Sequence, residues 1–333
     1  MTAMVALRLN MTGSGRDPAD GAARYRAAIE MAVHAEQHGF DVVNLEEHHC
    51  AENAWLASPL MLAGMIAART SRIRISVTAL LVTLYDPIRL AEDIAVLDVV
   101  SGGRFSFTAG LGYRPIEYHA TGQRWSDRGR RMDETIATLL KAWTGEPFEH
   151  RGEVVRVAPK PVSRPHPMFL IGGQSAPAAR RAARFGLPFY PPVHDPRLEK
   201  LYRDELARLG QTGFYLHPGS GNSMLILDRD PERAWPELAP HLLAELREYA
   251  SWRQAGVPRP GEEPVESVDD LRRQKRFEIL TPAACLDELQ SGRRAIAVLH
   301  PLAGGIPLER AWQSLRLFSD EVLPRLRTAE EPT

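Results

Sequence analysis

Apolar runs typical of buried strands alternate with amphipathic helical segments along most of the chain. This alternation predicts βα units whose strands pair in a parallel sheet. The predicted strands cover residues 4–10, 40–45, 72–82, 104–109, 168–171, 187–190, 223–227 and 295–300. The predicted helices cover residues 24–38, 58–68, 87–100, 128–143, 177–185, 196–209, 231–252 and 308–325. Strands and helices in this number favour an α/β fold of the (β/α)8 TIM-barrel type. An open doubly wound sheet is the alternative, and the lack of a GxGxxG motif after the first strand counts against it.

The composition fits one large folded domain. The chain has 333 residues, 44% of them hydrophobic, and a formal net charge of −1. A barrel of this length commonly forms a single domain, so we expect one domain over residues 1–333. The balanced charge favours neither a nucleic acid nor an anionic membrane as partner. The apolar start is broken by Arg8 and Asn10, well short of the roughly 20 residues of a membrane span.

Two stretches interrupt the alternation of strands and helices. Residues 211–222 are rich in glycine, and residues 254–275 are rich in Pro, Glu and Arg with little apolar periodicity. The second stretch is an insertion after the seventh predicted strand. Long insertions between barrel elements are commonly lids or linkers. We therefore predict that residues 254–275 form a mobile lid.

The second predicted strand ends in a group of titratable side chains, Glu46, Glu47, His48 and His49. Parallel barrel strands deliver catalytic residues at their carboxyl ends. Side chains alternate between the two faces of a strand, so at most one of the two histidines is expected to point into a given site. An imidazole changes its charge near neutral pH and serves as an acid or a base. His48 is the predicted catalytic residue.

Two other kinds of chemistry are possible for these residues. A zinc site of a barrel hydrolase would need several protein ligands, for which Glu46, His48, His119 and His300 are candidates. The sequence has neither an HxH on the first strand nor an HExxH motif, so this reading comes second and we predict no metal. Cys50 follows His49 and is a candidate thiol nucleophile, although no third orienting group stands nearby. Cys50 and Cys285 are the only cysteines and form no CxxC motif, which favours a reducing cytoplasm.

Four segments carry a resemblance to a known family. They are GFDVVNLEEHH (39–49), DPIRLAEDIAVLDVVSGGRFSFTAGLGYRPIEYHATG (86–122), FLIGGQSAPAARRAARFG (169–186) and LHPLAGGIPLERAWQSLRLFSDEVLPRL (299–326). In this order they resemble the bacterial-luciferase-like family of flavin-dependent monooxygenases and oxidoreductases. The match covers most of the chain and is specific to the family, but not to a substrate.

The resemblance implies a cofactor and a reaction. One branch of the family uses reduced FMN and O2 on a small organic substrate, through a flavin C4a-(hydro)peroxide. The other branch uses the deazaflavin F420 for hydride transfer. The motifs EEHH and GLGYRP favour the FMN monooxygenase branch, which would need a separate flavin reductase because no NAD fingerprint is present. A flavin-binding relative without activity is a further alternative, since a fold does not fix a function.

The resemblance also implies where the flavin phosphate binds. Gly173, Gln174 and Ser175 lead from the fifth strand into a helix whose first amides and dipole favour an anion. Where the nearest family pattern has an acid this chain has Gln174, and where that pattern has a hydroxyl it has Ala178. Arg130 matches the position of the family's phosphate-binding arginine, and the alternative is a solvated ion pair with Asp133 or Glu134 on its own helix.

Other residues are expected around the flavin ring. Gly110 leaves room for close approach of a ligand, and a tight turn is the alternative. Tyr113 lines the mouth of the barrel, together with Arg114 and His119. Trp55 would cover a ring, while Glu47 and His49 would support their neighbours. Alignment with the family places a non-prolyl cis peptide at Thr78–Ala79, with Ala79 small enough to lie under the ring.

The helix expected at residues 58–68 has no polar face before Arg69. An outer barrel helix normally shows polar residues to water. The small residues Ala63, Gly64 and Ala67 would let a partner helix approach closely. We therefore predict a homodimer through this helix, with cover by an intrachain loop as the alternative.

Overall fold

The computed structural model describes residues 3–13, 17–218, 223–252 and 265–328. The chain divides into two compact units. Unit 1 consists of Met1–Asn44, Ala51–Ala57 and Gly219–Thr333, and unit 2 of Leu45–Cys50 and Ser58–Pro218.

Unit 1 combines parallel strands with α-helices. Its strands are β1 (Met4–Leu9), β2 (Val42–Leu45, the last residue in unit 2), β9 (Met224–Leu227), β10 (Phe277–Leu280) and β11 (Ile296–Leu299). Its helices are α1 (Pro18–Gln37), α8 (Pro231–Ser251), α9 (Val268–Gln274), α10 (Pro282–Gln290), α11 (Leu308–Leu317) and α12 (Leu323–Thr328). The strand order is β10-β9-β11-β1-β2, and the pairs β1–β11, β9–β10 and β9–β11 are parallel.

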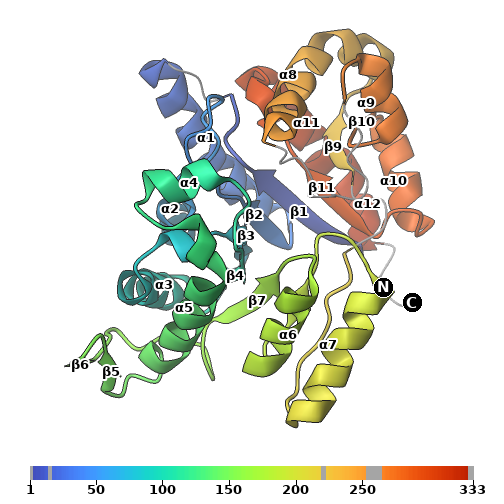
Figure 1. Cartoon of the computed structure of the whole chain (residues 1–333). Helices are drawn as coiled ribbons and strands as arrows, with labels where there is room; N and C mark the ends of the chain where they lie inside the picture. Colours follow the sequence, from blue (N-terminus) through green and yellow to red (C-terminus); the bar gives the residue numbers. More distant parts are fainter. Residues whose placement is uncertain (1–2, 14–16, 219–222, 253–264, 329–333) are drawn as a thin grey trace. The chain divides into compact units, whose positions relative to one another are not determined.

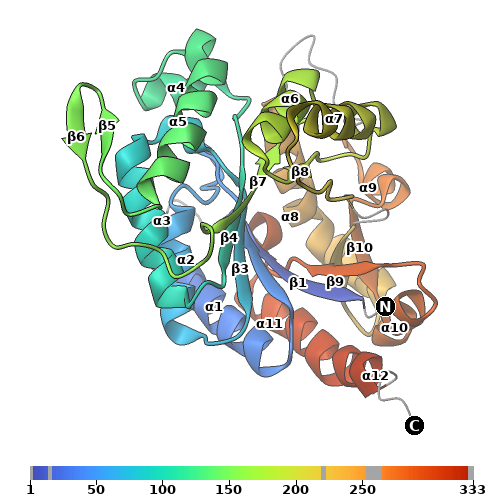
Figure 2. The same cartoon turned by 90° about the horizontal axis from the view of Figure 1, so that it is seen from below.

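Unit 2 also combines parallel strands with α-helices. Its strands are β3 (Arg74–Leu80), β4 (Phe105–Ala109), β7 (Met168–Gly172) and β8 (Phe189–Tyr190), with the antiparallel hairpin of β5 (Phe148–His150) and β6 (Glu153–Val155). Its helices are α2 (Pro59–Arg69), α3 (Pro87–Ser101), α4 (Pro115–Ala120), α5 (Arg128–Ala142), α6 (Ala176–Phe185) and α7 (Pro196–Leu209). The order β3-β4-β7-β8 is parallel throughout, and α6 and α7 lie side by side (Figures 1 and 2).

Local sequence signals account for the ends of α3. The Asp86 carboxylate accepts hydrogen bonds from the amides of Ile88 and Arg89, and Pro87 takes the first helical position. Gly102 ends the helix in the left-handed conformation, at φ 63°, which glycine adopts without strain. Leu90, Ile94 and Leu97 on the apolar face of α3 are buried, as the periodicity predicts, but Val100 is exposed.

The core of unit 2 is built on aromatic side chains of neighbouring strands. Phe107 of β4 is paired in register with Phe169 of β7, and their rings stack with centroids 5.0 Å apart. Trp143, directly after α5, is buried and donates its ring N–H to the carbonyl of Ala91 at 3.0 Å. The strands that end at the candidate site therefore rest on a packed interior.

The region between the seventh and eighth predicted strands differs from the expectation. It contains β10 and α10, which the sequence analysis did not predict, and β10 pairs with β9. Part of the predicted lid at 254–275 lies outside the described residues. Its later part forms α9, which opens with a capping box between Ser267 and Asp270. Such a box is a local helix-start signal, so the later part is not the irregular loop that was expected.

Helix α2 also differs in part from its prediction. Ala63 and Ala67 are buried within the chain together with Leu62 and Ile66, because α2 packs on α3 and β3. These two small residues are therefore not available to a partner helix. The face of α2 that stays apolar and exposed is carried by Met61 and Met65.

Candidate active site

The chain leaves β2 through residues 46–50, and Glu47 anchors this exit. Its buried carboxylate accepts hydrogen bonds from the amide of Leu81 and the hydroxyl of Tyr85, both of which follow β3. It also lies 2.9 Å from Nε2 of His49. Glu47 therefore holds the ends of two strands together and positions His49.

His48 lies between two polar partners. Its Nδ1 is 3.0 Å from Oε1 of Glu117, and its Nε2 is 3.1 Å from the hydroxyl of Tyr113. The His48 side chain is 10% exposed, while the Glu117 side chain is fully buried. A carboxylate only accepts hydrogen bonds, so Nδ1 carries the proton that is shared with Glu117. The other nitrogen, Nε2, then faces a hydroxyl that can either donate or accept.

Glu117 is the residue that the sequence analysis missed. It lies on α4, and its Oε1 also accepts from the amide of His49 at 3.1 Å. Arg114 donates to the same oxygen at 3.3 Å and to the carbonyls of His49 and Cys50. Within the described part of the chain, the buried Oε2 of Glu117 has no hydrogen-bond partner. The i, i+3 pairing of Arg114 with Glu117 was the available sequence signal.

The two adjacent histidines pair with different carboxylates. His48 is paired with Glu117, and His49 with Glu47. The hydrogen bond to Glu47 raises the pKa of His49, against the opposing effect of burial. Only His48 is thus placed beside the second polar residue, Tyr113.

The turn from β7 into α6 has the features of an anion site. Gly173 has φ +135°, and a Cβ there would lie 2.9 Å from the Cβ of Ala178. Ser175 is the N-cap of α6, and its side chain accepts from the amide of Ala178. Gln174 is half-buried and Ser175 is exposed. Pro177 has no amide N–H and the amide of Ala178 already donates to Ser175, so an anion at this turn would rely on the amides from Gly173 to Ala176.

Arg130 makes the ion pairs of a solvated helix face. Its guanidinium is 2.6 Å from Glu134 and 3.2 Å from Asp127, and its side chain is 60% exposed. Another arginine links α6 to the start of α5, since Arg181 pairs with Asp133 at 2.5 Å and donates to the carbonyl of Gly129. A role of Arg130 at a phosphate stays a prediction.

Ala79 and Gly110 lie against each other. The Thr78–Ala79 peptide bond is cis, as the resemblance implied. A Cβ on Gly110 would come within 2.8 Å of the Cβ of Ala79, and the Gly110 amide donates to the carbonyl of Leu80. Gly110 therefore has a packing reason to be glycine, independent of any ligand.

Trp55 belongs to unit 1 and is buried. Its ring lies 5.7 Å from that of Tyr249 and 5.2 Å from that of Trp252, at the end of α8. These contacts are those of a core residue, and a role over a flavin ring stays a prediction.

The thiol and metal alternatives gain no support from this site. Cys50 is exposed, and the nearby imidazoles pair with carboxylates. Among the described residues, one group of three has ligand atoms close enough to hold a metal ion, and it contains none of the zinc candidates Glu46, His48, His119 and His300.

Comparison with known proteins identifies the family. The family described as luciferase-like monooxygenase matches residues 7–295. The chain belongs to this family. Family membership and the likeness to solved structures together assign the fold as the luciferase-like (β/α)8 barrel. Among the described residues, no helix combines the length and the apolar character needed to cross a membrane.

Relatives within the luciferase-like family use different cofactors. The chain is 28% identical over 167 residues to an FMNH2-dependent dimethylsulfone monooxygenase of Pseudomonas putida, covering 46% of this chain and 45% of the relative. It is 31% identical over 175 residues to an F420-dependent glucose-6-phosphate dehydrogenase of Segniliparus rotundus, covering 48% and 51%. The matches span about half the length of the curated relatives. Among solved structures, the monooxygenase RslO1 of Streptomyces bottropensis superposes with a TM-score of 0.73 at 23% identity, over 97% of this chain and 99% of that one.

Proposed function

We propose that this chain is a flavin-dependent monooxygenase that uses reduced FMN and O2 on a small organic substrate. The observation that carries the proposal is His48, held through Nδ1 by the buried Glu117 and facing Tyr113 through Nε2. A histidine whose second nitrogen meets a hydroxyl can take up or release a proton there. The relative from Pseudomonas putida, an FMNH2-dependent monooxygenase, supports the choice of cofactor.

The residues at the β7–α6 turn fit the phosphate of FMN. The positive φ of Gly173 and its close approach to Ala178 leave a turn without a side chain ahead of the helix amides. Gly173, Gln174 and Ser175 would hold the phosphate through backbone amides and the Ser175 hydroxyl. Arg130 would contribute charge after exchanging its present pairing with Glu134. Ala79 would lie under the ring, with Gly110 packed behind it.

When bound, reduced FMN supplies the electrons that activate O2. The protein groups would orient the reactants and move protons. Glu117 fixes the ring of His48 and keeps the proton on Nδ1, so that Nε2 exchanges protons through Tyr113. Arg114 fixes the carbonyls of His49 and Cys50, which keeps the exit from β2 rigid.

Anaerobic titration tests the cofactor. The purified chain is titrated with FMN, FMNH2 and F420, and the FMNH2 complex is then mixed with O2 and followed by absorbance. We expect FMNH2 to bind tightest and to be oxidised on the protein. Riboflavin lacks the phosphate and should bind more weakly than FMN. Equal binding of riboflavin and FMN would contradict the phosphate site.

Hydride transfer with F420 is the second candidate. The F420-dependent relative is 31% identical to the chain, slightly more than the 28% of the FMNH2-dependent relative. Tight binding of F420, with reduction of F420 by an alcohol or sugar phosphate and no oxygen consumption, would favour this function.

The partners of the monooxygenase are also part of the proposal. A separate flavin reductase would supply FMNH2, since no dinucleotide-binding motif is present in the sequence. A homodimer would cover Met61 and Met65 of α2 and the exposed residues Val96, Val99 and Val100 of neighbouring α3. Sedimentation should show a dimer at micromolar concentration, and Met61→Lys should dissociate it.

A further inference from the structure

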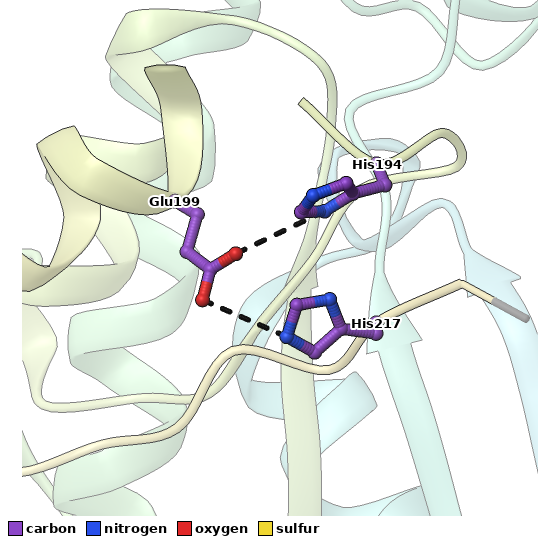
Figure 3. Close-up of side chains that lie close together, drawn as sticks. All are labelled: His194, Glu199 and His217. Carbon is purple, nitrogen blue, oxygen red and sulfur yellow. Dashed lines mark ion pairs between the residues drawn. The ribbon is translucent and has the colours of Figure 1, made fainter. Parts of the chain in front are cut away.

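Three side chains of unit 2 that could ligate a metal lie close together, and none of them belongs to the His48–Glu117 pair. They are His194, Glu199 and His217 (Figure 3). Nδ1 of His194 lies 3.9 Å from Oε2 of Glu199, and Nε2 of His217 lies 3.6 Å from Oε1. One ligand atom of each residue lies within 4.8 Å of the other two. We propose that His194, Glu199 and His217 bind a divalent transition-metal ion of the Zn²⁺ class.

The distances fit a metal better than direct hydrogen bonds. A hydrogen bond between nitrogen and oxygen is about 2.7–3.2 Å long, and both separations exceed this range. Two ligand atoms that are each about 2.0–2.1 Å from a tetrahedral Zn²⁺ lie roughly 3.3 Å apart. Small rotations of the two imidazoles would therefore bring all three ligands to coordination distance.

The backbone brings the ligands together from distant positions in the sequence. Phe189 of β8 forms a parallel bridge with Tyr215, so the chain segments that follow both residues leave the sheet on the same side. His194 follows β8, and His217 follows Tyr215. Glu199 lies in the first turn of α7, which Asp195 caps by accepting from the amide of Arg197. The three positions are thus held by a strand pair and a helix start.

Tyr215 helps to arrange the two imidazoles. Its ring contacts the ring of His194 edge-on at 5.8 Å and that of His217 at 5.0 Å, while its hydroxyl accepts from the amide of Asp195 at 3.4 Å. Packing of this kind restricts the rotamers of metal ligands and lowers the entropy lost when the metal binds.

The charges at the cluster suit a cation with one carboxylate ligand. Arg203 donates to Oε1 of Glu199 at 3.0 and 2.7 Å. Oε2 of Glu199, which lies 3.9 Å from Nδ1 of His194, is left for the metal. The side chains of His194 and His217 are 41% and 58% exposed. Solvent can thus deliver the ion and fill its remaining coordination positions.

The choice of metal follows from the ligands. Two imidazoles and one carboxylate suit Zn²⁺ and neighbouring first-row ions, whereas Mg²⁺ and Ca²⁺ prefer oxygen ligands. The ion would join the segment before α7 to the segment after it, two residues from the point at which the chain passes from unit 2 to unit 1. The site is independent of the proposed flavin function.

The test is a titration of the tag-free, full-length chain with ZnCl2 after treatment with a chelator. Calorimetry should show one zinc per chain at this site, with a Kd of about 1 µM or tighter. His194→Ala, His217→Ala and Glu199→Gln should each weaken binding at least tenfold. Thermal melting in chelator should be unchanged by the exposed substitutions His194→Ala and His217→Ala, while added zinc should raise the Tm of the parent chain and not that of the variants.

His38→Ala is the matched control. His34 and His38 lie one turn apart on α1 with ring centroids 3.9 Å apart, so they are another pair of imidazoles that could chelate zinc. The control should bind zinc at this site like the parent chain. Anomalous scattering from a zinc-soaked crystal should place the ion between His194 and His217. Absence of saturable binding, or unchanged binding in the His194→Ala/His217→Ala double variant, would overturn the proposal.

Discussion

Each unit contains a buried histidine paired with a buried glutamate, but the two pairs have different surroundings. In unit 2, His48 meets Glu117 on one side and the hydroxyl of Tyr113 on the other. In unit 1, His300 lies 3.2 Å from Glu245 through Nε2 and 3.1 Å from the carbonyl of Arg8 through Nδ1. Both neighbours of His300 are hydrogen-bond acceptors, whereas Nε2 of His48 faces a hydroxyl that can donate or accept.

Glu245 and Glu117 differ in how completely their carboxylate oxygens are hydrogen-bonded. Each oxygen of Glu245 has two partners, which are Asn10 and His300 at Oε1 and Thr12 and the Gly304 amide at Oε2. In the described part of the chain, Oε2 of Glu117 has none. Burial alone would raise the pKa of Glu245, but the charge and hydrogen bond of His300 outweigh it and hold this pKa at about 2. We infer that complete pairing marks a structural ion pair, and incomplete pairing a site prepared for a ligand.

Replacing His48 should have the largest effect on activity. His48→Ala should lower turnover by roughly 10²–10⁴, as expected for loss of a general acid or base, with little change in flavin affinity. His119→Ala, an exposed histidine on α4, is the control and should keep turnover near the parent value. Steady-state kinetics with saturating reduced flavin measures the difference. Unchanged turnover in His48→Ala would remove this residue from the mechanism.

Replacing Glu245 should affect stability instead. Glu245→Gln removes the charge of a fully buried carboxylate with four hydrogen-bond partners and should lower the free energy of unfolding by about 3–5 kcal/mol. Glu237→Gln on the same helix removes a half-exposed partner of Arg310 and should cost about 1 kcal/mol or less. Urea unfolding measures both values. If Glu245→Gln instead kept full stability and lost turnover, the assignment of roles to the two pairs would be reversed.

Lowering the pH should reduce the stability of the protein through the Glu245–His300 pair. The folded pKa of Glu245 lies below its ordinary value of 4.5, so its contribution to stability is complete above about pH 4.5 and is lost as the pH falls toward about 2. A lowering of this size corresponds to roughly 3 kcal/mol. Urea unfolding from pH 5 to pH 3 should therefore show a steeper loss for the parent than for Glu245→Gln. Parallel curves would show that Glu245 is not held ionised.

Replacing Glu117 should have the smallest effect. It tests most directly whether Glu117 and Glu245 have different roles. Glu117→Gln keeps the shape and can still accept from His48, but it removes the negative charge. Turnover should fall about tenfold through weaker positioning of His48, while FMN affinity changes little. The free energy of unfolding should fall less than in Glu245→Gln, because the buried Arg114, which loses its carboxylate partner, still donates to the carbonyls of His49 and Cys50. A loss of stability as large as that of Glu245→Gln would make Glu117 a structural residue too.

Several features of this protein are determined by local sequence. Asp86, Pro87 and Gly102 fix the ends of α3, because caps and glycine turns depend on a few neighbouring residues. The apolar run before Glu46 placed His48 at the end of β2. The short strand β10 was missed, because four residues, Phe277–Leu280, carry too little periodicity to stand out beside a polar insertion.

The partners of the titratable groups were decided only by the tertiary structure. His48 and Glu117 are 69 positions apart, and His300 and Glu245 are 55 apart, with no motif linking the members of either pair. The cluster of His194, Glu199 and His217 likewise depends on the bridge between Phe189 and Tyr215. Strand pairing brings distant residues into contact, and the burial that follows decides which charges are satisfied. The spacing of residues along the chain shows neither which strands pair nor which charges are buried. The sequence could therefore predict His48 as a site residue but not Glu117 as its partner.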